Sequence, residues 1–265
     1  MTSSTITLDN NTIMATTDSG DLPVIDYTYL AERDTHGQRT KRSLEESHKL
    51  YTSLRECGFM YLRHPGISQA KVDELFSHQQ RFFAKPLEEK TKILGRMDKG
   101  RGPSQGYSCP ALLAADPKTS DIKEFFGMYR DDDLNKPNQW LEDDDSVAMR
   151  KDLVAFFNSC REVILQLLSS LAQEVGLPSD HMHTFVSEEN HFIACLHYPA
   201  TSEESFANRV RAAAHTDYGC MTLLFNDQSK GLQVMRGGKY EYVPRLADCA
   251  VVNGQLIPFI LLERG

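Results

Sequence analysis

The sequence predicts an α+β protein in which a helical N-terminal region precedes a β-rich C-terminal core. Three features support this fold class: two stretches of helical periodicity before residue 90, a long apolar stripe over residues 147–175, and a series of short β-rich segments after about residue 190. Apolar residues that recur every 3.6 positions indicate amphipathic helices, whereas several short strands in series favour a sandwich or a barrel. With 265 residues the chain is long enough to bury one large core.

The N-terminal segment is expected to be a loose tail followed by a strand. Residues 1–20, MTSSTITLDNNTIMATTDSG, are polar and lack the basic and apolar stretches of a signal peptide. We therefore expect a disordered tail there. The following segment, DLPVIDYTYL (21–30), alternates apolar and polar residues, which predicts a short opening strand.

Two amphipathic helices are predicted next, each followed by a residue that stops helices. The first spans residues 41–57 before Gly58, and FMYL follows it as a second short strand. The second spans residues 69–86 and ends at Pro86. The apolar stripes of the two helices consist of Leu44, Tyr51, Leu54 and Cys57 in the first, and Val72, Leu75, Phe76, Phe82 and Phe83 in the second.

The longest predicted helix spans residues 147–175. Ser146 can cap its N-terminus, and Gly176 and Pro178 close it. Its continuous apolar stripe predicts that it lies along a sheet or barrel. The β-rich segments that follow are HFIACLHYPA, AAAHTDYG, CMTLLFND, GLQVM, KYEYVP and CAVVN.

Composition and charge exclude several classes of function. A net charge of −8 argues against binding to nucleic acid or to an anionic membrane surface, and no apolar run approaches membrane-spanning length. The six cysteines are widely spaced without a CxxC pair, which indicates free thiols of a cytoplasmic protein. The acidic clusters 131–133 and 143–145 lack the alternating ligands and glycine of a calcium loop, so we expect solvated loops there.

The strongest chemical signal is the pair His215 and Asp217, two positions apart at the head of a predicted strand. Residues i and i+2 of a strand point to the same face, so both side chains can reach one cation, and Gly219 leaves room beside them. An imidazole and a carboxylate make up two thirds of the 2-His-1-carboxylate triad that holds Fe(II). The alternative is a pair of polar residues on a sheet face, because the tripeptide alone is a weak motif.

The stretch HTDYGCMTLLFNDQSKGLQV resembles the metal-binding core of the isopenicillin-N-synthase-like branch of the 2-oxoglutarate/Fe(II)-dependent dioxygenases. LPVIDY, CGFMYL…GI, FFAKPLEEK, GYS, DIKEFF, PNQW and LHYP are similar to segments of the same family, in the same order, from about residue 21 to 253. The resemblance implies helices packed on a double-stranded β-helix, or jelly roll. It also implies Fe(II), 2-oxoglutarate and O2, with His215 and Asp217 as metal ligands and Tyr198 at the distal carboxylate of 2-oxoglutarate.

The resemblance further implies oxidation of a small organic substrate, by hydroxylation, desaturation or ring chemistry, in specialised-metabolite biosynthesis. Halogenation fits less well, because halogenating relatives lack the carboxylate that Asp217 provides. The chain departs from the family at RHPGI (63–67), usually NHGI, and at Ala194, where an arginine is common. For Arg209 and Arg211 we expect surface positions, and for Tyr198 a half-buried strand position is the alternative to a binding role.

A second iron-binding histidine is not evident, because His215 is the last histidine and only residues 218–265 follow the pair. We therefore predict that the last strands of the jelly roll, the second histidine and an Arg-x-Ser motif are missing from a truncated chain. A substitute ligand would have to come from His181, His183, His191 or His197. The alternatives are a catalytically inactive binding or dimerising protein and an iron oxidase that does not use 2-oxoglutarate.

The sequence thus divides into four regions. These are a tail (1–20), an N-terminal dioxygenase region (21–135), a loop with the long helix (136–188) and a truncated Fe(II)/2-oxoglutarate β-core (189–265). The oligomeric state stays open.

Overall fold

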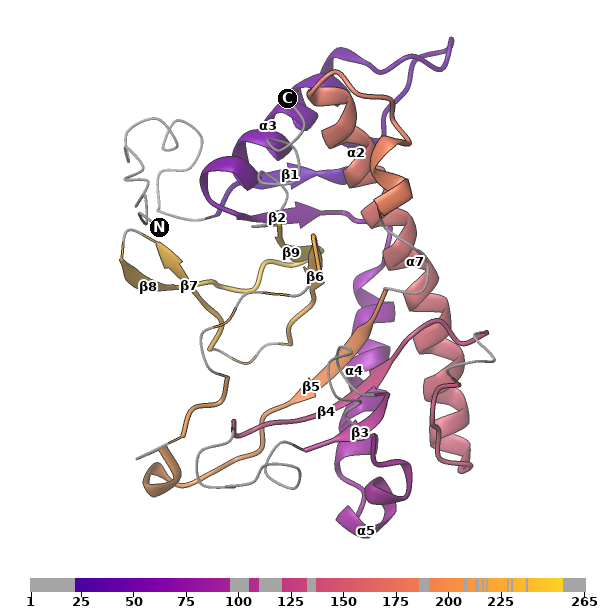
Figure 1. The fold of residues 1–265 in the computed structure, drawn as a ribbon, viewed down its shortest axis with the longest axis vertical. Helices are drawn as coiled ribbons and strands as arrows, with labels where there is room; N and C mark the ends of the chain where they lie inside the picture. Colours follow the sequence, from indigo (N-terminus) through magenta and orange to yellow (C-terminus); the bar gives the residue numbers. More distant parts are fainter. Residues whose placement is uncertain are drawn as a thin grey trace. The chain divides into compact units, whose positions relative to one another are not determined.

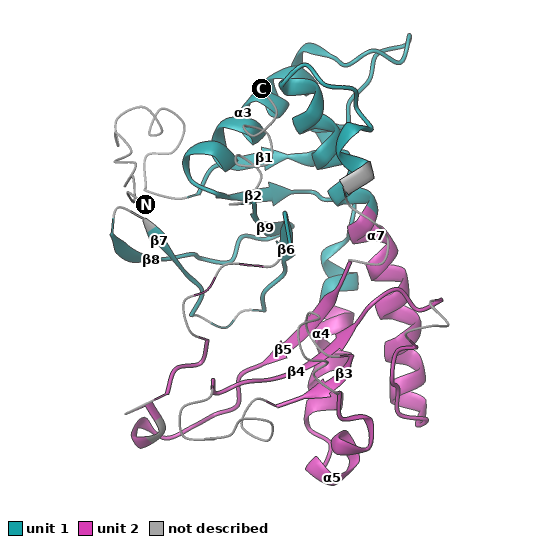
Figure 2. Cartoon of the chain, in the orientation of Figure 1, with its two compact units in different colours: residues 1–72, 162–183, 219–265 teal, residues 73–161, 184–218 magenta. Residues whose placement is uncertain are grey.

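The computed structural model describes residues 22–95, 105–109, 121–132, 137–185, 191–206, 209–212, 215, 217, 219–227, 229, 231–236 and 238–254. Short strands and helices alternate up to residue 174, and the elements after it are short strands and 3-10 turns (Figure 1), which agrees with the predicted α+β class. The chain forms two compact units, coloured separately in Figure 2. Unit 1 comprises residues 1–72, 162–183 and 219–265, and unit 2 comprises residues 73–161 and 184–218. The four sequential regions stay a prediction, and the tail lies outside the described residues.

The opening strand is shorter than its sequence pattern predicts. Strand β1 covers only Val24–Asp26, and the short helix α2 (Tyr27–Leu30) follows immediately. The side chain of Asp26 accepts a hydrogen bond from the backbone N–H of Thr28, at 3.0 Å, and so caps this helix. The prediction of a strand over residues 21–30 was therefore wrong in its second half, because a capping aspartate overrides the alternation.

The two predicted amphipathic helices are present as α3 (Lys41–Glu56) and α4 (Gln69–Phe83). Thr40 caps α3 through a hydrogen bond from the Ser43 N–H, and Gly58 follows with φ 75°, as expected of a helix stop. The predicted stripe of α3 was partly wrong, because Leu44 is 51 % exposed. Its buried face carries small and polar residues beside the leucines, namely Ser43, Glu46, Ser47, Leu50, Ser53 and Leu54.

The long helix α7 spans Asp144–Glu174 and ends at Gly176, whose φ is 77°. The predicted cap at Ser146 was wrong, because the helix starts two residues earlier. Asp143 accepts hydrogen bonds from the backbone N–H and the hydroxyl of Ser146, at 3.1 and 3.0 Å. The first turn is thus held by an aspartate carboxylate, which also suits the positive end of the helix dipole.

Unit 1 contains a four-stranded sheet with the order β1-β2-β9-β6. Its strands are β1, β2 (Phe59–Arg63), β9 (Cys249–Asn253) and β6 (Thr222–Leu224). β1 pairs with β2 in parallel, whereas β2 and β6 both pair with β9 in antiparallel fashion. The predicted strand FMYL therefore joins the C-terminal strand CAVVN, almost 190 residues later in the sequence.

A hairpin completes the strands of unit 1. It consists of β7 (Gln233–Arg236) and β8 (Lys239–Tyr242), and Gly238 at φ 78° lies in its turn. Val234 and the neighbouring Val243 pack against Tyr61 and Val251 of the sheet. The opposite side of the hairpin exposes Met235, Tyr240 and Tyr242.

Unit 2 contains the antiparallel sheet β3-β4-β5, formed by β3 (Gly106–Ser108), β4 (Glu124–Met128) and β5 (Ile193–His197). One face packs on the part of α7 in this unit, where Phe126, Met128 and Cys195 meet Met149 and Leu153. This confirms that the long helix lies along a sheet. The remaining buried members of this core are Leu75, Phe82, Phe83, Ile93, Tyr107 and Phe157.

The acidic clusters are more structured than the predicted solvated loops. Asp131 pairs with Arg150 at 2.9 Å and accepts a hydrogen bond from the Trp140 indole at 3.2 Å. Asp143 pairs with Lys85, and Asp145 pairs with Arg81. The prediction was therefore wrong for Asp131, whose side chain is only 16 % exposed, whereas the carboxylates of Asp132 and Asp145 are solvated, at 74 % and 55 % exposed. Asp133 lies outside the described residues.

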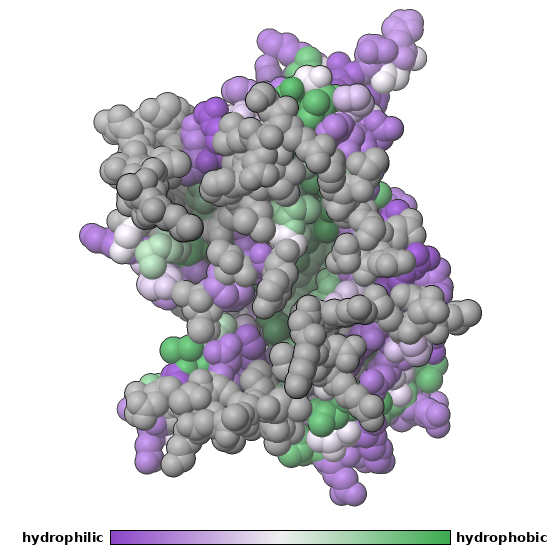
Figure 3. All heavy atoms as spheres, in the orientation of Figure 1, coloured by the Kyte–Doolittle hydropathy of each residue, from purple (hydrophilic) through white to green (hydrophobic). Residues whose placement is uncertain are grey.

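The six cysteines are free, as predicted, and Cys195 alone among them is fully buried. Burial raises the pKa of the Cys195 thiol to about 12, so it has no thiolate character near neutral pH. In the described part of the chain, no helix is both long and apolar enough to cross a membrane. Figure 3 shows hydrophilic residues over much of the described surface on one face, with smaller apolar patches between them.

Candidate metal and co-substrate site

His215 and Asp217 lie side by side in unit 2. The Nε2 atom of His215 is 3.5 Å from the Oδ1 atom of Asp217, and their side chains are 64 % and 29 % exposed. Metal–ligand bonds to histidine nitrogen and carboxylate oxygen are about 2.0–2.2 Å long, so one cation can contact donors up to about 4 Å apart. The two predicted ligands therefore have a separation that fits a shared divalent cation.

The secondary structure around the pair differs from the prediction. His215 and Asp217 belong to no strand, and the strand of the following segment, β6, begins only at Thr222. Strand alternation was therefore the wrong reason for expecting the two side chains together. They approach each other in an irregular segment, where their short spacing along the chain is enough to bring the two side chains together.

The donor set fits a non-haem iron or another divalent cation of similar preference. A neutral imidazole and a carboxylate are two of the three donors of the facial Fe(II) triad, which leaves open positions for other ligands. Within the described residues, no third histidine, cysteine or carboxylate joins these two in a cluster of metal-binding geometry. His215 and Asp217 are thus the two candidate ligands among the described residues of this segment.

The histidines considered as substitute ligands have other contacts. His197 Nδ1 lies 2.7 Å from Glu124 Oε1, and its ring stacks on Phe83. His183 Nε2 lies 2.9 Å from the Ser169 hydroxyl. His191 packs edge-on to Phe157, and for His181 no ligand cluster is found among the described residues. None of these contacts supports a role as the third metal ligand.

Tyr198 directly follows β5 in unit 2 and is 38 % exposed, so the predicted half-buried position is close to what is observed. Burial raises the pKa of its phenol, and the nearby cations Lys123 and Arg211 partly oppose that effect. The phenol is therefore a neutral hydrogen-bond donor at neutral pH. Such a donor beside cations suits an anionic oxygen of a ligand.

A buried charge network adjoins this position and was not foreseen from the sequence. Glu124 Oε2 accepts hydrogen bonds from the Tyr107 hydroxyl at 2.5 Å and from Lys90 Nζ at 2.9 Å, while Oε1 faces His197. Lys90 also donates to the carbonyl of Phe83. Segments DIKEFF, GYS and LHYP supply three of these residues, but nothing in their spacing indicates that they meet. The network joins β3, β4 and β5 and so fixes the end of β5 that carries Tyr198.

A second group of potential metal ligands consists of Glu74, His78 and Asp152. Its hydrogen bonds disfavour metal binding. Its donor atoms lie within 4.8 Å of one another. However, Arg81 donates to His78 Nδ1 at 2.8 Å, so in the neutral ring the proton sits on Nε2 and points to Asp152 at 2.9 Å. Nε2 then has no lone pair for a cation. This group is an Arg–His–Asp hydrogen-bond chain that connects α4 to α7.

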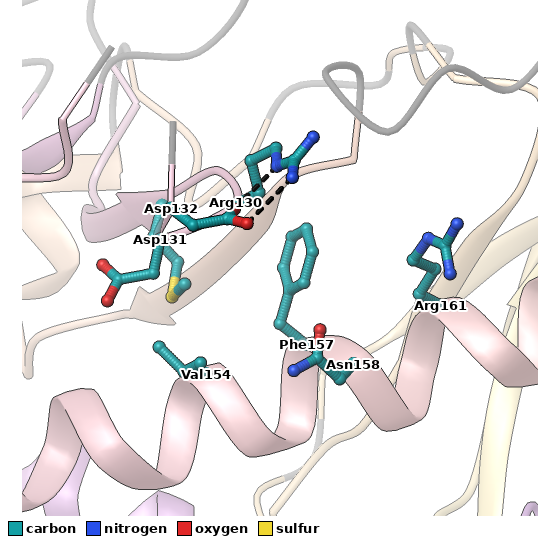
Figure 4. Close-up of a pocket in the computed structure, with 8 residues that line it drawn as sticks. Arg130, Asp131, Asp132, Val154, Phe157, Asn158 and Arg161 are labelled. Atoms are coloured by element: carbon teal, nitrogen blue, oxygen red, sulfur yellow. Dashed lines mark hydrogen bonds and ion pairs between the residues drawn. The ribbon is translucent and has the colours of Figure 1, made fainter. Parts of the chain in front are cut away.

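A hollow of about 430 Å³ lies between the end of β4 and α7 in unit 2 (Figure 4). Met128, Val154 and Phe157 give it an apolar floor. Arg130 at its rim makes two hydrogen bonds to the carboxylate of Asp132, at 2.7 and 2.9 Å. These rim charges compensate each other, and the hollow contains none of the predicted site residues. Its remaining lining residues are Asp131, Asn158 and Arg161.

Two family models match the chain. The model described as "non-haem dioxygenase in morphine synthesis N-terminal" matches residues 22–143, and the model of the 2OG-Fe(II) oxygenase superfamily matches residues 189–261. The second match includes Tyr198, His215 and Asp217. Together the two models cover most of the chain outside its N-terminal tail and the long helix.

The chain is similar to several fungal proteins. It is 32 % identical over 208 residues to a proline hydroxylase of Petromyces alliaceus, covering 75 % of this chain and 64 % of that protein. It is 28 % identical over 237 residues to a 2-oxoglutarate-dependent dioxygenase of Glarea lozoyensis, covering 80 % of this chain and 71 % of that protein. The chain thus spans somewhat less than two thirds of the proline hydroxylase.

Solved structures share the fold. The Neurospora crassa T7H in complex with alpha-ketoglutarate and thymine has a TM-score of 0.77 and 28 % identity, over 90 % of this chain and 75 % of that one. A C-terminally truncated form of the same protein in the apo state has a TM-score of 0.76 and 28 % identity, over 93 % and 87 % of the two chains. These structures have the jelly-roll fold of 2-oxoglutarate/Fe(II) oxygenases, which confirms the predicted fold class.

Proposed function

Because the chain belongs to the 2-oxoglutarate/Fe(II)-dependent dioxygenase family, we propose that the protein oxidises a small organic substrate with Fe(II), 2-oxoglutarate and O2. The observation that carries this proposal is the 3.5 Å approach of His215 Nε2 to Asp217 Oδ1. This pair lies in the segment matched by the oxygenase model and offers the two donor types of a facial iron site.

The chain's own residues have separate roles in this proposal. His215 and Asp217 hold the cation, and Tyr198 donates its phenolic hydrogen to a carboxylate oxygen of 2-oxoglutarate. The buried carboxylate of Glu124 holds His197, and with it the end of the strand before Tyr198. When bound, Fe(II) with 2-oxoglutarate and O2 supplies an oxidant strong enough to remove a hydrogen atom from an unactivated carbon, with succinate and CO2 as co-products.

The substrate is proposed to be a small metabolite, modified in the cytoplasm during specialised-metabolite biosynthesis. Similarity to a fungal proline hydroxylase and to a structure with bound thymine supports small, polar cyclic molecules as first candidates. The carboxylate of Asp217 supports hydroxylation, desaturation or ring chemistry over halogenation, because halide would need that coordination position. Proline and thymine are therefore the first compounds to assay.

Succinate formation tests the proposed function. The purified full chain is incubated with Fe(II), ascorbate, 2-oxoglutarate and each candidate substrate, and succinate is quantified with and without O2. We expect O2-dependent succinate in the wild type and its loss in His215→Ala. His48→Ala is the matched control, because its ring is exposed and bonded to Glu174.

The two alternative functions give distinct outcomes in the same assay. An inactive binding protein forms no succinate and retains no iron, which contradicts the proposal. An iron oxidase consumes O2 with the substrate but leaves 2-oxoglutarate unchanged. That result would contradict the proposed use of 2-oxoglutarate as co-substrate and would agree with the proposed metal site.

A further inference from the structure

We propose that the hollow between the end of β4 and α7 binds a small apolar monocarboxylate, whose apolar body covers the floor and whose carboxylate binds at Arg161. This binding site goes beyond the proposed oxidation, and its described lining does not include His215 or Asp217. Its basis is that one face of α7 continues past the end of a strand, and that apolar and charged groups follow one another along that face.

The hollow exists because a face of α7 extends beyond the strand that covers it. Met149 and Leu153 pack against the sheet of unit 2, but β4 ends at Met128 and residues 131 and 132 form a turn. The helix residues that line the hollow follow at positions 154, 157, 158 and 161, which is the spacing of one helical face. This face therefore borders a turn instead of a strand, and a hollow of about 430 Å³ remains (Figure 4).

The size and the floor of the hollow suit an apolar group. Its volume lies within the range of about 300–1,000 Å³ that is usual for small-molecule sites. Met128 and Phe157 are buried and Val154 is half-buried, so three apolar side chains form the floor. An apolar group on this floor removes apolar surface from water on both sides of the contact, which favours binding.

The charged groups follow a definite order along the hollow (Figure 4). Asp131 and Asp132 lie at one end; Asp132 accepts two hydrogen bonds from Arg130, and Asp131 has an arginine partner of its own. Arg161 lies at the other end, on the helix seven residues after Val154, or about 10.5 Å along its axis. One end of the hollow thus carries compensated carboxylates, and the other end carries a cation.

The cationic end suits a carboxylate. The Nε atom of Arg161 is buried, so part of the guanidinium is withdrawn from water, where a charge attracts an anion more strongly. The planar guanidinium fork matches the two oxygens of a carboxylate. Asn158, one helical turn earlier on the same face, carries an amide that can donate to the same group. The carboxylates at the far end repel a second negative charge, which favours a monocarboxylate over a dianion such as 2-oxoglutarate.

The single tryptophan of the chain reports on the hollow. The indole N–H of Trp140 donates to Asp131 Oδ1 at 3.2 Å, and Asp131 lines the hollow. The metal-free full chain is titrated with 4-phenylbutanoate, whose extended length is close to two helical turns, and with 4-phenylbutan-1-ol, which has the same apolar body without the charge. Trp140 emission and titration calorimetry both follow binding. We expect saturable binding of both probes, with the carboxylate about 10-fold tighter.

Substitutions separate the role of the cation from that of the floor. Arg161→Gln should weaken 4-phenylbutanoate about 10-fold and leave the alcohol within about twofold, and Arg161→Lys should retain part of the affinity. Val154→Phe fills the hollow and should weaken both probes at least about 10-fold. Lys151→Gln removes an exposed positive charge of the same helix outside the described lining, and it should bind as wild type.

Other outcomes overturn the inference. These are no saturable binding of either probe to the wild type, equal affinity for the two probes, an equal loss of both in Arg161→Gln, or unchanged binding in Val154→Phe. Loss of 4-phenylbutanoate binding in His215→Ala would place the carboxylate at the metal pair instead. The melting temperature of each variant is compared with that of the wild type, and if Arg161→Gln does not fold, the preference for the carboxylate in Arg161→Lys decides. Because the titrations need neither iron nor turnover, this inference and the proposed function can fail separately.

Discussion

The carboxylate of Glu124 lies 2.7 Å from His197 Nδ1, and the two residues are direct partners across strands β4 and β5. Glu124 is 8 % exposed and also contacts Lys90 and Tyr107, which are 6 % and 1 % exposed. A buried carboxylate is tolerated only when its lone pairs are satisfied, and here three donors satisfy them. The fold therefore places an ionic hub directly before the proposed co-substrate residue Tyr198.

Removal of the Glu124 carboxylate is expected to destabilise the protein strongly. In Glu124→Ala the buried ammonium of Lys90 loses its counter-ion, and we expect the free energy of unfolding to fall by about 3–5 kcal/mol. Glu45→Ala is the control, because Glu45 is 56 % exposed and pairs only with an exposed lysine. Its effect should stay within about 0.5 kcal/mol. Urea unfolding measures the free energy of unfolding of both variants. Equal losses in Glu124→Ala and Glu45→Ala would contradict a stabilising role for the buried Glu124 carboxylate.

The same carboxylate makes stability depend on acid pH. Burial alone raises the pKa of Glu124, but hydrogen bonds from Tyr107, Lys90 and His197 outweigh burial and hold the pKa below its usual value. Because the folded-state pKa is the lower one, ionised Glu124 stabilises the fold above the unfolded-state pKa of about 4.3. This contribution is lost as the pH falls through the folded-state pKa.

We therefore expect the unfolding free energy of the wild type to fall more steeply below pH about 5 than that of Glu124→Gln. Asp143, whose pKa is also lowered, is present in both proteins and cancels in the difference. Chemical denaturation at a series of pH values provides the measurement. Parallel pH profiles for the two proteins would show that Glu124 has the same pKa in both states.

The third prediction concerns which residue caps the N-terminus of α7. The sequence pattern assigned the cap to Ser146, whereas the structure assigns it to Asp143. Asp143→Ala removes the cap and the ion pair with Lys85, and we expect a loss of about 1–2 kcal/mol. Ser146→Ala should cost less, and Asp143→Asn should keep most of the cap. Thermal unfolding measures the stability of each variant. A larger loss of stability in Ser146→Ala than in Asp143→Ala would show that Ser146 is the N-terminal cap of α7, as the sequence pattern predicted.

Substitution of Gly106, at the start of β3, is expected to destabilise the fold. Its φ is 81°, and a Cβ atom there would collide with the backbone carbonyl oxygen of Ile93 and lie 3.3 Å from Gln139 Cβ. Gly37 has a similar φ of 74° with nothing within 4 Å, so Gly37→Ala reports the backbone strain alone. Gly106→Ala should be about 1–3 kcal/mol more destabilising. Equal losses in the two variants would mean that the β3 segment moves freely.

Local signals explain which elements the sequence could predict. Helices α3 and α4 were predicted because periodic apolar residues and stop residues lie within a few positions of each other. The strand prediction failed at Tyr27–Leu30, since the capping side chain of Asp26 decides that segment. The pairing of β2 with β9 was not predicted, because no local signal links residues 59–63 to residues 249–253.

The candidate site was predicted only where its residues are close in sequence. His215 and Asp217 share one tripeptide, so their proximity could be expected even though the strand that was to align them is absent there. The hub of Lys90, Tyr107, Glu124 and His197 brings together residues more than 100 positions apart. Arg211 was assigned to the surface, and the structure confirms that it is exposed.

Manganese binding followed by electron paramagnetic resonance tests the central claim most directly, because the signal of free Mn(II) disappears when the ion is bound. The full chain is titrated anaerobically with Mn(II) in the presence of 2-oxoglutarate. We predict saturable binding of one ion, weakened by at least about 10-fold in His215→Ala and in Asp217→Ala. Asp227→Ala, which removes an exposed carboxylate bonded to the Ser229 N–H, should bind as wild type. Wild-type affinity in both His215→Ala and Asp217→Ala would contradict a metal site at this pair.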